Sequence, residues 1–178
     1  MKTYVALFRG INVGGRHALP MNALRLVLEN NGCRDVRTYI QSGNAVFRSA
    51  AADPARLAAR VAAAVSSSHG FQPGVLVLTL GDLESAAAAN PFPEADGDPK
   101  SVHLFFLTER PKKPDLQSLD TLKAASERFA LEGRVFYLHT PAGFGASRLA
   151  ARAERLLGVE ATARNWRTVT ALLDMAKT

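Results

Sequence analysis

Residues 36–49 read VRTYIQSGNAVFRS, and their pattern predicts a β-hairpin. The first half alternates as a strand does, with Val36, Thr38 and Ile40 expected on one face. The segment SGN (42–44) predicts the reversal, because Gly and Asn both tolerate the left-handed backbone that tight turns need. Residues 45–49 then form the returning strand.

The segments on either side of this hairpin supply one strand and one helix each. TYVALF (3–8) predicts a strand, and a helix follows from Pro20 to about Asn31, ended by Gly32. After the hairpin, a helix is expected from Asp53-Pro54 to Gly70, and the apolar run VLVLTL (75–80) predicts a buried strand. The order β-α-β-β-α-β is that of the ferredoxin-like split βαβ motif.

The same order of elements is expected a second time further along the chain. The predicted elements are strands at 102–108, 129–131, 135–139 and 159–162, helices at 115–125 and 146–157, and a last helix from about Asn165. We therefore predict an α+β fold of two tandem ferredoxin-like βαββαβ halves with antiparallel sheets, plus a C-terminal helix. The expected organisation is a first half over 1–80, a helical and acidic linker over 81–100, and a second half over 101–178.

Composition excludes several classes of protein. The 178 residues are 47% hydrophobic, which excludes an intrinsically disordered chain. A single cysteine, Cys33, excludes an internal disulfide or a cysteine-based zinc site, and we expect it to be packed. The histidines show no paired ligand spacing, so neither a metal nor a cofactor is expected. No apolar run is long enough for a membrane span and the N-terminus does not fit a secretory signal, so we expect a cytoplasmic protein.

The charge is positive and uneven. There are 22 Lys and Arg against 16 Asp and Glu, a net charge of +6. Residues 81–99 hold five acids and no basic residue, which leaves the rest of the chain at +11, from 22 basic and 11 acidic residues. Such a field attracts anionic partners. An Arg-rich and Ala-rich composition can also reflect a GC-rich genome, and both explanations stay open.

The loop RGINVGG (9–15) is the strongest local signal for a binding site. It follows a strand and precedes a helix, where glycines allow backbone N–H groups to approach an anion. The candidate ligand-binding residues here are Arg9, Gly10, Asn12, Gly14, Gly15 and Arg16. Alternatively, the glycines only turn the chain. A phosphate-binding P-loop is not supported, because Arg16 and His17 stand where Lys and then Ser or Thr are needed.

The hairpin tip is expected to complete this site with Gln41, Ser42 and Asn44. In the βαββαβ order the first and third strands are antiparallel neighbours, so the end of the first strand at Arg9 meets the turn before Asn44. Turn chemistry or a solvent-facing polar strand is the alternative explanation. A secondary cationic group comprises Arg148, Arg164 and Asn165. The alternative explanations are a solvated helix face for Arg148 and a helix cap for Asn165.

Four segments together resemble one protein family. They are RGINVGG (9–15), TYIQSGNAVF (38–47), NPFP (90–93) and TARNWRTVTAL (162–172), and the likeness extends from Tyr4 to about Leu173. The chain resembles the domain-of-unknown-function 1697 family, with Arg16 and Arg148 at positions where Lys is more common. The resemblance implies a cytoplasmic bacterial protein with ferredoxin-like subdomains, and it assigns no reaction.

Three functions fit these patterns. The first is a small anionic ligand, phosphate or nucleotide-like, bound at the two loops. The second is nucleic-acid binding, since an RNA-recognition sheet stacks bases on strand aromatics and Tyr4, Phe8 and Phe47 lie on predicted strands. The third is a protein-interaction module without catalysis. No standard catalytic set is evident, so whether the chain is an enzyme stays open, as do its oligomeric state and the ligand's identity.

Overall fold

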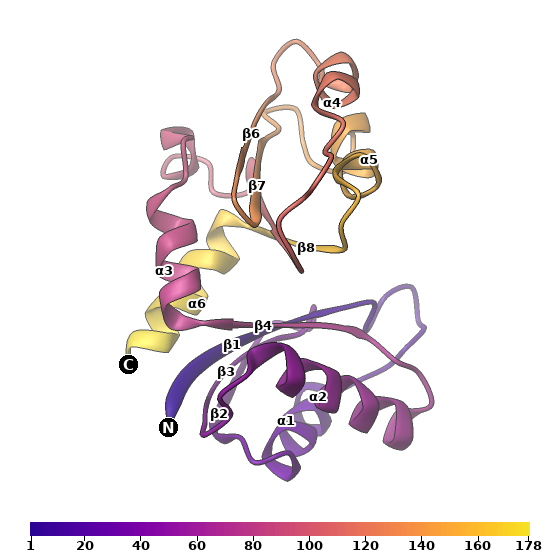
Figure 1. Ribbon diagram of the computed structural model, residues 1–178, viewed down its shortest axis with the longest axis vertical. Coiled ribbons are helices and arrows are strands. Elements are labelled where there is room, and N and C mark those ends of the chain that lie inside the picture. Colours follow the sequence, from indigo (N-terminus) through magenta and orange to yellow (C-terminus); the bar gives the residue numbers. More distant parts are fainter. The chain divides into compact units, whose positions relative to one another are not determined.

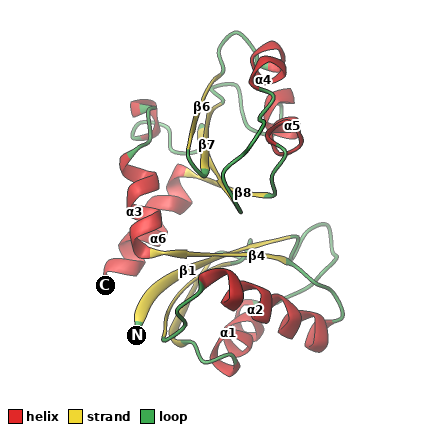
Figure 2. Cartoon of the chain, viewed as in Figure 1, coloured by secondary structure: helices red, strands yellow, loops and turns green.

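The computed structural model describes all 178 residues and divides into two compact units. The first comprises Met1–Ser85 with Ala171–Thr178, and the second comprises Ala86–Thr170. Each unit holds one four-stranded antiparallel sheet with helices on it (Figures 1 and 2). The predicted fold class, two βαββαβ halves and a C-terminal helix, is confirmed.

The first unit has the sheet order β2-β3-β1-β4, the arrangement of the ferredoxin-like motif. Its elements are β1 (Lys2–Arg9), α1 (Met21–Asn30), β2 (Arg34–Tyr39), β3 (Asn44–Ser49), α2 (Pro54–His69) and β4 (Gly74–Thr79). Helix α2 begins where Asp53 accepts hydrogen bonds from the N–H groups of Ala55 and Arg56, and it ends at Gly70 in the left-handed conformation. The start and stop signals in the sequence therefore mark this helix correctly.

The core of the first unit lies between its sheet and the helices α1 and α2. Tyr4 and Phe8 of β1 and Phe47 of β3 are about 1% exposed and pack into this core. The hydroxyl of Tyr4 also donates to the carbonyl of Ala51 at 2.5 Å. These three aromatic rings are therefore core residues and do not form a base-stacking face.

The second unit repeats this order of strands. Its sheet runs β6-β7-β5-β8. The remaining elements of the chain are α3 (Leu80–Ala88), the 3₁₀ helix η1 (Pro93–Ala95), β5 (Val102–Leu107), α4 (Leu116–Leu122), β6 (Arg128–Glu132), β7 (Val135–His139), α5 (Arg148–Leu157), β8 (Ala161–Asn165) and α6 (Trp166–Lys177). A core of Phe105, Phe136 and Leu138 packs against Leu149 and Leu157 of α5. Two halves of unlike sequence thus use one topology.

The NPFP segment (90–93) packs onto the sheet of the second unit. The Phe92 ring stacks on His139 with centroids 5.8 Å apart, and the Arg128 guanidinium lies 5.1 Å from the Phe92 centroid. Arg128 also pairs with Glu94. This motif therefore anchors the acidic segment through an aromatic side chain that contacts both the His139 ring and the Arg128 cation.

Several predicted ends move by a few residues. Leu80 begins α3 rather than ending a strand, because Thr79 and Asp82 exchange side-chain and backbone hydrogen bonds as a capping box does. The last strand is shifted to Ala161–Asn165, where Asn165 pairs with His103 of β5. Helix α4 ends at Leu122 instead of residue 125. Strand β2 ends at Tyr39, which leaves Ile40 in the turn and exposed instead of on the buried face.

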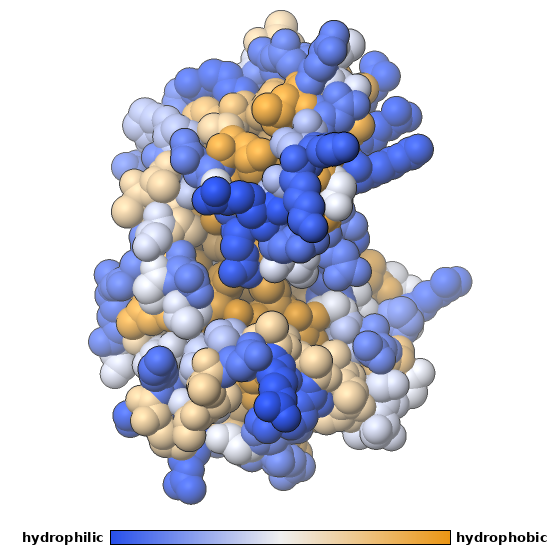
Figure 3. All heavy atoms as spheres, in the orientation of Figure 1, coloured by the Kyte–Doolittle hydropathy of each residue, from blue (hydrophilic) through white to orange (hydrophobic).

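Hydrophilic and apolar residues are interspersed on the face shown in Figure 3. None of the helices combines the length and the apolar character that crossing a bilayer requires.

Candidate functional site

The RGINVGG loop folds as a small hairpin of its own. The N–H of Asn12 donates to the carbonyl of His17 at 3.0 Å, and the N–H of Arg16 donates to the carbonyl of Val13 at 3.0 Å. Gly14 and Gly15, with φ of 57° and 73°, occupy the two central positions, as a type I′ turn requires. These two glycines are therefore explained by the turn, and two of the loop's N–H groups are used within it.

The side chain of Asn12 holds the loop to its surroundings. Its Nδ2 donates to the carbonyl of Leu19 at 2.9 Å and to the carbonyl of Gln41 at 2.8 Å. Its Oδ1 accepts the N–H of Leu19 at 2.7 Å. Asn12 thus joins the loop to the segment before α1 and to the β2–β3 turn. The hydrogen bonds of its amide therefore stabilise the fold.

His17 anchors the other side of the loop. Its Nδ1 lies 2.9 Å from the carbonyl oxygen of Gly10 and donates to it, since a carbonyl only accepts. The imidazole stacks on Phe71 with ring centroids 4.5 Å apart and an interplanar angle of 10°. No sequence pattern indicates this role of His17, because nothing local relates it to Phe71, 54 residues away in the chain.

The turn between β2 and β3 meets the RGINVGG loop closely. The N–H of Phe8 donates to the carbonyl of Gly43 at 2.8 Å. A Cβ on Gly43 would lie 2.6 Å from Ile11 Cδ1 and 2.7 Å from Phe8 Cβ, and its φ is 89°. Only glycine fits there without displacing its neighbours.

Asn44 is fully buried at the start of β3. Its Nδ2 donates to the carbonyl of Tyr39 at 3.0 Å and to Ser42 Oγ at 3.1 Å. The amide closes the turn, as the alternative based on turn chemistry expected. The two asparagines proposed as ligand contacts therefore both have a structural task.

We define the loop junction as residues 9–17 together with 40–44. The predicted adjacency of the two loops is confirmed by the Asn12–Gln41 and Phe8–Gly43 hydrogen bonds. The candidate residues brought together are Arg9, Gly10, Asn12, Gly14, Gly15, Arg16, Gln41, Ser42 and Asn44. Ligand binding at these residues stays a prediction.

The exposed side chains of the junction include two cations and two aliphatic groups, together with His17, Gln41 and Ser42. Arg9 and Arg16 are exposed, Val13 is 65% exposed and Ile40 is 51% exposed. Ile40 has φ of 50°, which is unusual for a β-branched residue. No sequence pattern indicates that Val13 and Ile40 are exposed, because strand alternation puts Ile40 on the same face as Val36, which is buried.

The secondary cationic group has a structural explanation for each member. Arg148 is exposed at the first residue of α5, a helix capped by Ser147. Arg164 in β8 donates to the carbonyl of Ala163 at 2.9 Å, and burial lowers its pKa to about 10. Asn165 accepts the N–H of Thr168 at 2.9 Å and so caps α6.

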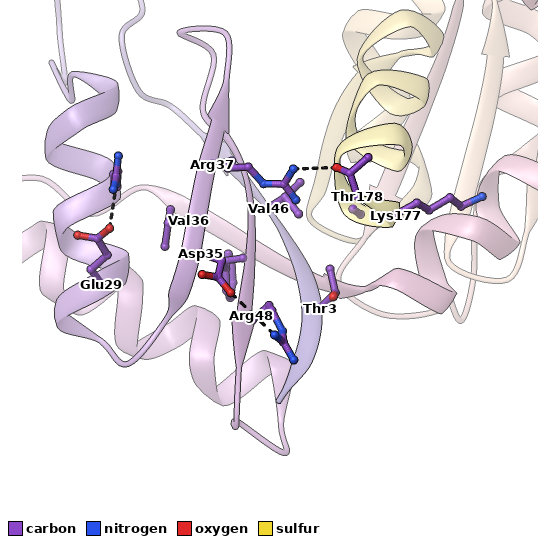
Figure 4. A pocket seen from close by; sticks show the side chains of 12 residues that line it. Thr3, Glu29, Asp35, Val36, Arg37, Val46, Arg48, Lys177 and Thr178 are labelled. Atoms are coloured by element: carbon purple, nitrogen blue, oxygen red, sulfur yellow. Dashed lines mark hydrogen bonds and ion pairs between the residues drawn. The ribbon is translucent and has the colours of Figure 1, made fainter.

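An open groove of about 940 Å³ lies elsewhere on the first unit, between α1, β2, β3 and the end of α6 (Figure 4). Its arginines have partners. Arg48 lies 3.9 Å from Asp35, and Arg25 lies 2.8 Å from Glu29. Arg37 donates to Thr178 Oγ1 at 2.9 Å and to the carbonyl of Met175 at 2.5 Å. Each arginine that lines the groove is therefore already paired within the chain.

Cys33 offers no reactive thiol. It is 3% exposed in the core of the first unit, as expected. Burial raises the pKa of the thiol to about 11, so the thiolate is scarce at neutral pH. No three His, Cys, Asp or Glu side chains gather as a metal site would require.

Comparison with known proteins now places the chain. A family model described as "Protein of unknown function (DUF1697)" matches residues 1–137. The chain belongs to this family. The matched part of this DUF1697 protein includes the whole loop junction and ends before the NWRTVTAL segment. A solved structure of a conserved bacterial protein, SP0830 from Streptococcus pneumoniae, is 26% identical over 100% of this chain and 99% of that one, with a TM-score of 0.73. No curated protein matches.

Proposed function

We propose that this DUF1697 protein is a binding module that takes an anionic ligand at the loop junction. The observation that carries the proposal is the Asn12 bridge at 2.8 Å from Gln41, which holds two polar loops together. Arg9 and Arg16 are exposed on this fixed scaffold. Preorganised loops lose little conformational entropy when a ligand binds, which favours affinity.

The charge of the junction supports an anion. Residues 9–17 and 40–44 contain two arginines and no Asp or Glu. A guanidinium matches phosphate and carboxylate groups with paired N–H donors. The ligand chemistry we propose is therefore a phosphate or carboxylate group. Base stacking on Tyr4, Phe8 and Phe47 gives no support to a nucleic-acid ligand, because these rings are in the core.

The experiment is titration calorimetry of the full chain with pyrophosphate and with hexaglutamate as probes. Arg9→Ala and Arg16→Ala are each expected to weaken binding roughly 5- to 150-fold, since a hydrogen bond to a charged group contributes about 1–3 kcal/mol. Arg56→Ala is the matched control, because Arg56 is an exposed arginine of the same unit on α2. Each variant is first shown to be folded by its melting curve.

Two results would contradict the proposal. One is that neither probe binds the wild-type chain at millimolar concentration. The other is that Arg9→Ala and Arg16→Ala bind a probe as tightly as Arg56→Ala does.

A further inference from the structure

We infer that the anionic ligand of the loop junction is an acidic segment of another protein that also carries an aliphatic or aromatic side chain, packed on Val13 and Ile40. This inference rests on the anion site proposed above and narrows its ligand to one class.

Two exposed apolar side chains lie at the junction. Val13 and Ile40 are two of five large hydrophobic residues that the structure leaves exposed, and the other three are Met1, Leu26 and Leu116. Val13 follows Asn12 and Ile40 precedes Gln41, and those two neighbours are hydrogen-bonded at 2.8 Å. The two loops that carry Val13 and Ile40 are thereby held together, and Arg9 and Arg16 belong to the first of these loops.

Folding gives no reason for isoleucine at position 40. Its side chain is half exposed, so it contributes little to the core, and its backbone has φ of 50°. Asn or Gly adopts that conformation with less strain. A strained, exposed aliphatic residue is explained when a partner covers it, because the contact then buries its apolar surface.

The shape of the junction fits a protein better than a small molecule. Residues 13–18 are all exposed, and they form a hairpin around the turn at Gly14 and Gly15. Small ligands are usually enclosed by concave pockets. An exposed hairpin offers no such enclosure, whereas an extended segment of another protein can lie along it. The cations at the junction call for acidic residues in that segment.

The experiment selects peptides from a random twelve-residue phage library on the purified full chain. The selected peptides are expected to combine Asp or Glu with an aliphatic or aromatic residue. Their dissociation constants are then measured by fluorescence polarisation. Val13→Ser and Ile40→Asn are each expected to weaken peptide binding at least tenfold while leaving pyrophosphate binding unchanged.

Leu26→Ser is the matched control, because Leu26 on α1 is 58% exposed and lies outside the junction. Asn suits the left-handed backbone at position 40, so the Ile40→Asn variant is expected to stay folded. A loss of peptide binding in this variant is therefore not caused by unfolding. A second measurement uses vesicles with one-fifth anionic lipid, to which wild type is expected not to bind.

The outcomes separate this inference from the proposed function. Suppose that Val13→Ser and Ile40→Asn bind the selected peptides with wild-type affinity, whereas Arg16→Ala binds them more weakly. The inference is then overturned and the anion site stands. If Arg16→Ala changes neither peptide nor pyrophosphate binding, the anion site itself fails. A library that yields no enriched acidic peptide, or vesicle binding that Val13→Ser abolishes, also overturns the inference.

Discussion

Asn12 donates a hydrogen bond of 2.8 Å to the carbonyl oxygen of Gln41, 29 residues further along the chain. The same amide exchanges two more hydrogen bonds with the backbone of Leu19. One side chain thus connects the βα loop, the approach to α1 and the β2–β3 turn.

Removing this amide is expected to destabilise the first unit. Asn12→Ala loses three hydrogen bonds, each worth about 1 kcal/mol, so the free energy of unfolding should fall by about 2–4 kcal/mol. Urea denaturation followed by circular dichroism measures the change. Asn22→Ala serves as the control, since Asn22 is exposed and its side chain accepts one local hydrogen bond. An equal fall in the free energy of unfolding in both variants would show that the Asn12 hydrogen bonds contribute no more to stability than the single local bond of Asn22.

Gly43→Ala is expected to be more damaging than Gly14→Ala. A methyl group at Gly43 would lie 2.6 Å from Ile11, whereas one at Gly14 meets nothing within 4 Å. Both positions have positive φ, but the 89° at Gly43 lies outside the left-handed region that contains the 57° at Gly14, so backbone strain and the clash both add to the cost at Gly43. Melting temperatures compare the two. Equal losses would mean that the contact between the loops is loose.

Ile40→Asn is expected to raise stability. The left-handed backbone at φ of 50° suits Asn, and the wild-type side chain is 51% exposed, so little packing is lost. The gain should be about 1 kcal/mol, measured by urea denaturation. Ile40→Val keeps the β-branch and should show no gain. If Ile40→Asn is less stable than wild type, then Ile40 packs in a way that outweighs its strain.

Acid is expected to weaken the second unit through His103. Burial lowers the pKa of His103 to about 4, its Nδ1 has no hydrogen-bond partner, and its ring stacks on Phe144 at 3.8 Å. Well above pH 6.5 the imidazole is neutral in both states. As the pH falls toward 4, only the unfolded chain takes up the proton, so stability declines by about 2–3 kcal/mol across that window.

His103→Phe removes this titration while keeping an aromatic ring for the stack. The free energy of unfolding, measured by urea at pH 7, 6, 5 and 4, should fall less steeply in the variant than in wild type. Parallel pH profiles would assign the acid sensitivity to other groups.

Cys33 is expected to resist alkylation. Its side chain is buried and its thiol pKa is raised to about 11. Iodoacetamide should therefore modify the folded chain far more slowly than the chain unfolded in urea at about 8 M, which is enough to unfold most small domains. Mass spectrometry follows the reaction. Comparable rates in both conditions would show that the first unit opens readily. Cys33→Ser should leave binding at the junction unchanged.

The order of elements could be predicted from the sequence because its signals are local. The Asp53 cap and the Gly70 stop that bound α2 act within a few residues of themselves. The alternation before the SGN turn and the apolar runs in β4 and β5 are equally local. Antiparallel pairing of β1 with β3 then follows from the topology, and with it the meeting of Arg9 with the turn at Gly43.

The roles of individual side chains at the junction were decided by contacts between distant segments. Whether Asn12 faces a ligand or Leu19 and Gln41 depends on how two loops pack, and no residue spacing encodes this. Ile40 continues a strand pattern, yet the chain turns one residue earlier, because Asn44 binds the carbonyl of Tyr39 and closes the turn there. Local patterns specify secondary structure through backbone propensity, whereas exposure and hydrogen-bond partners are set only when the whole sheet has formed.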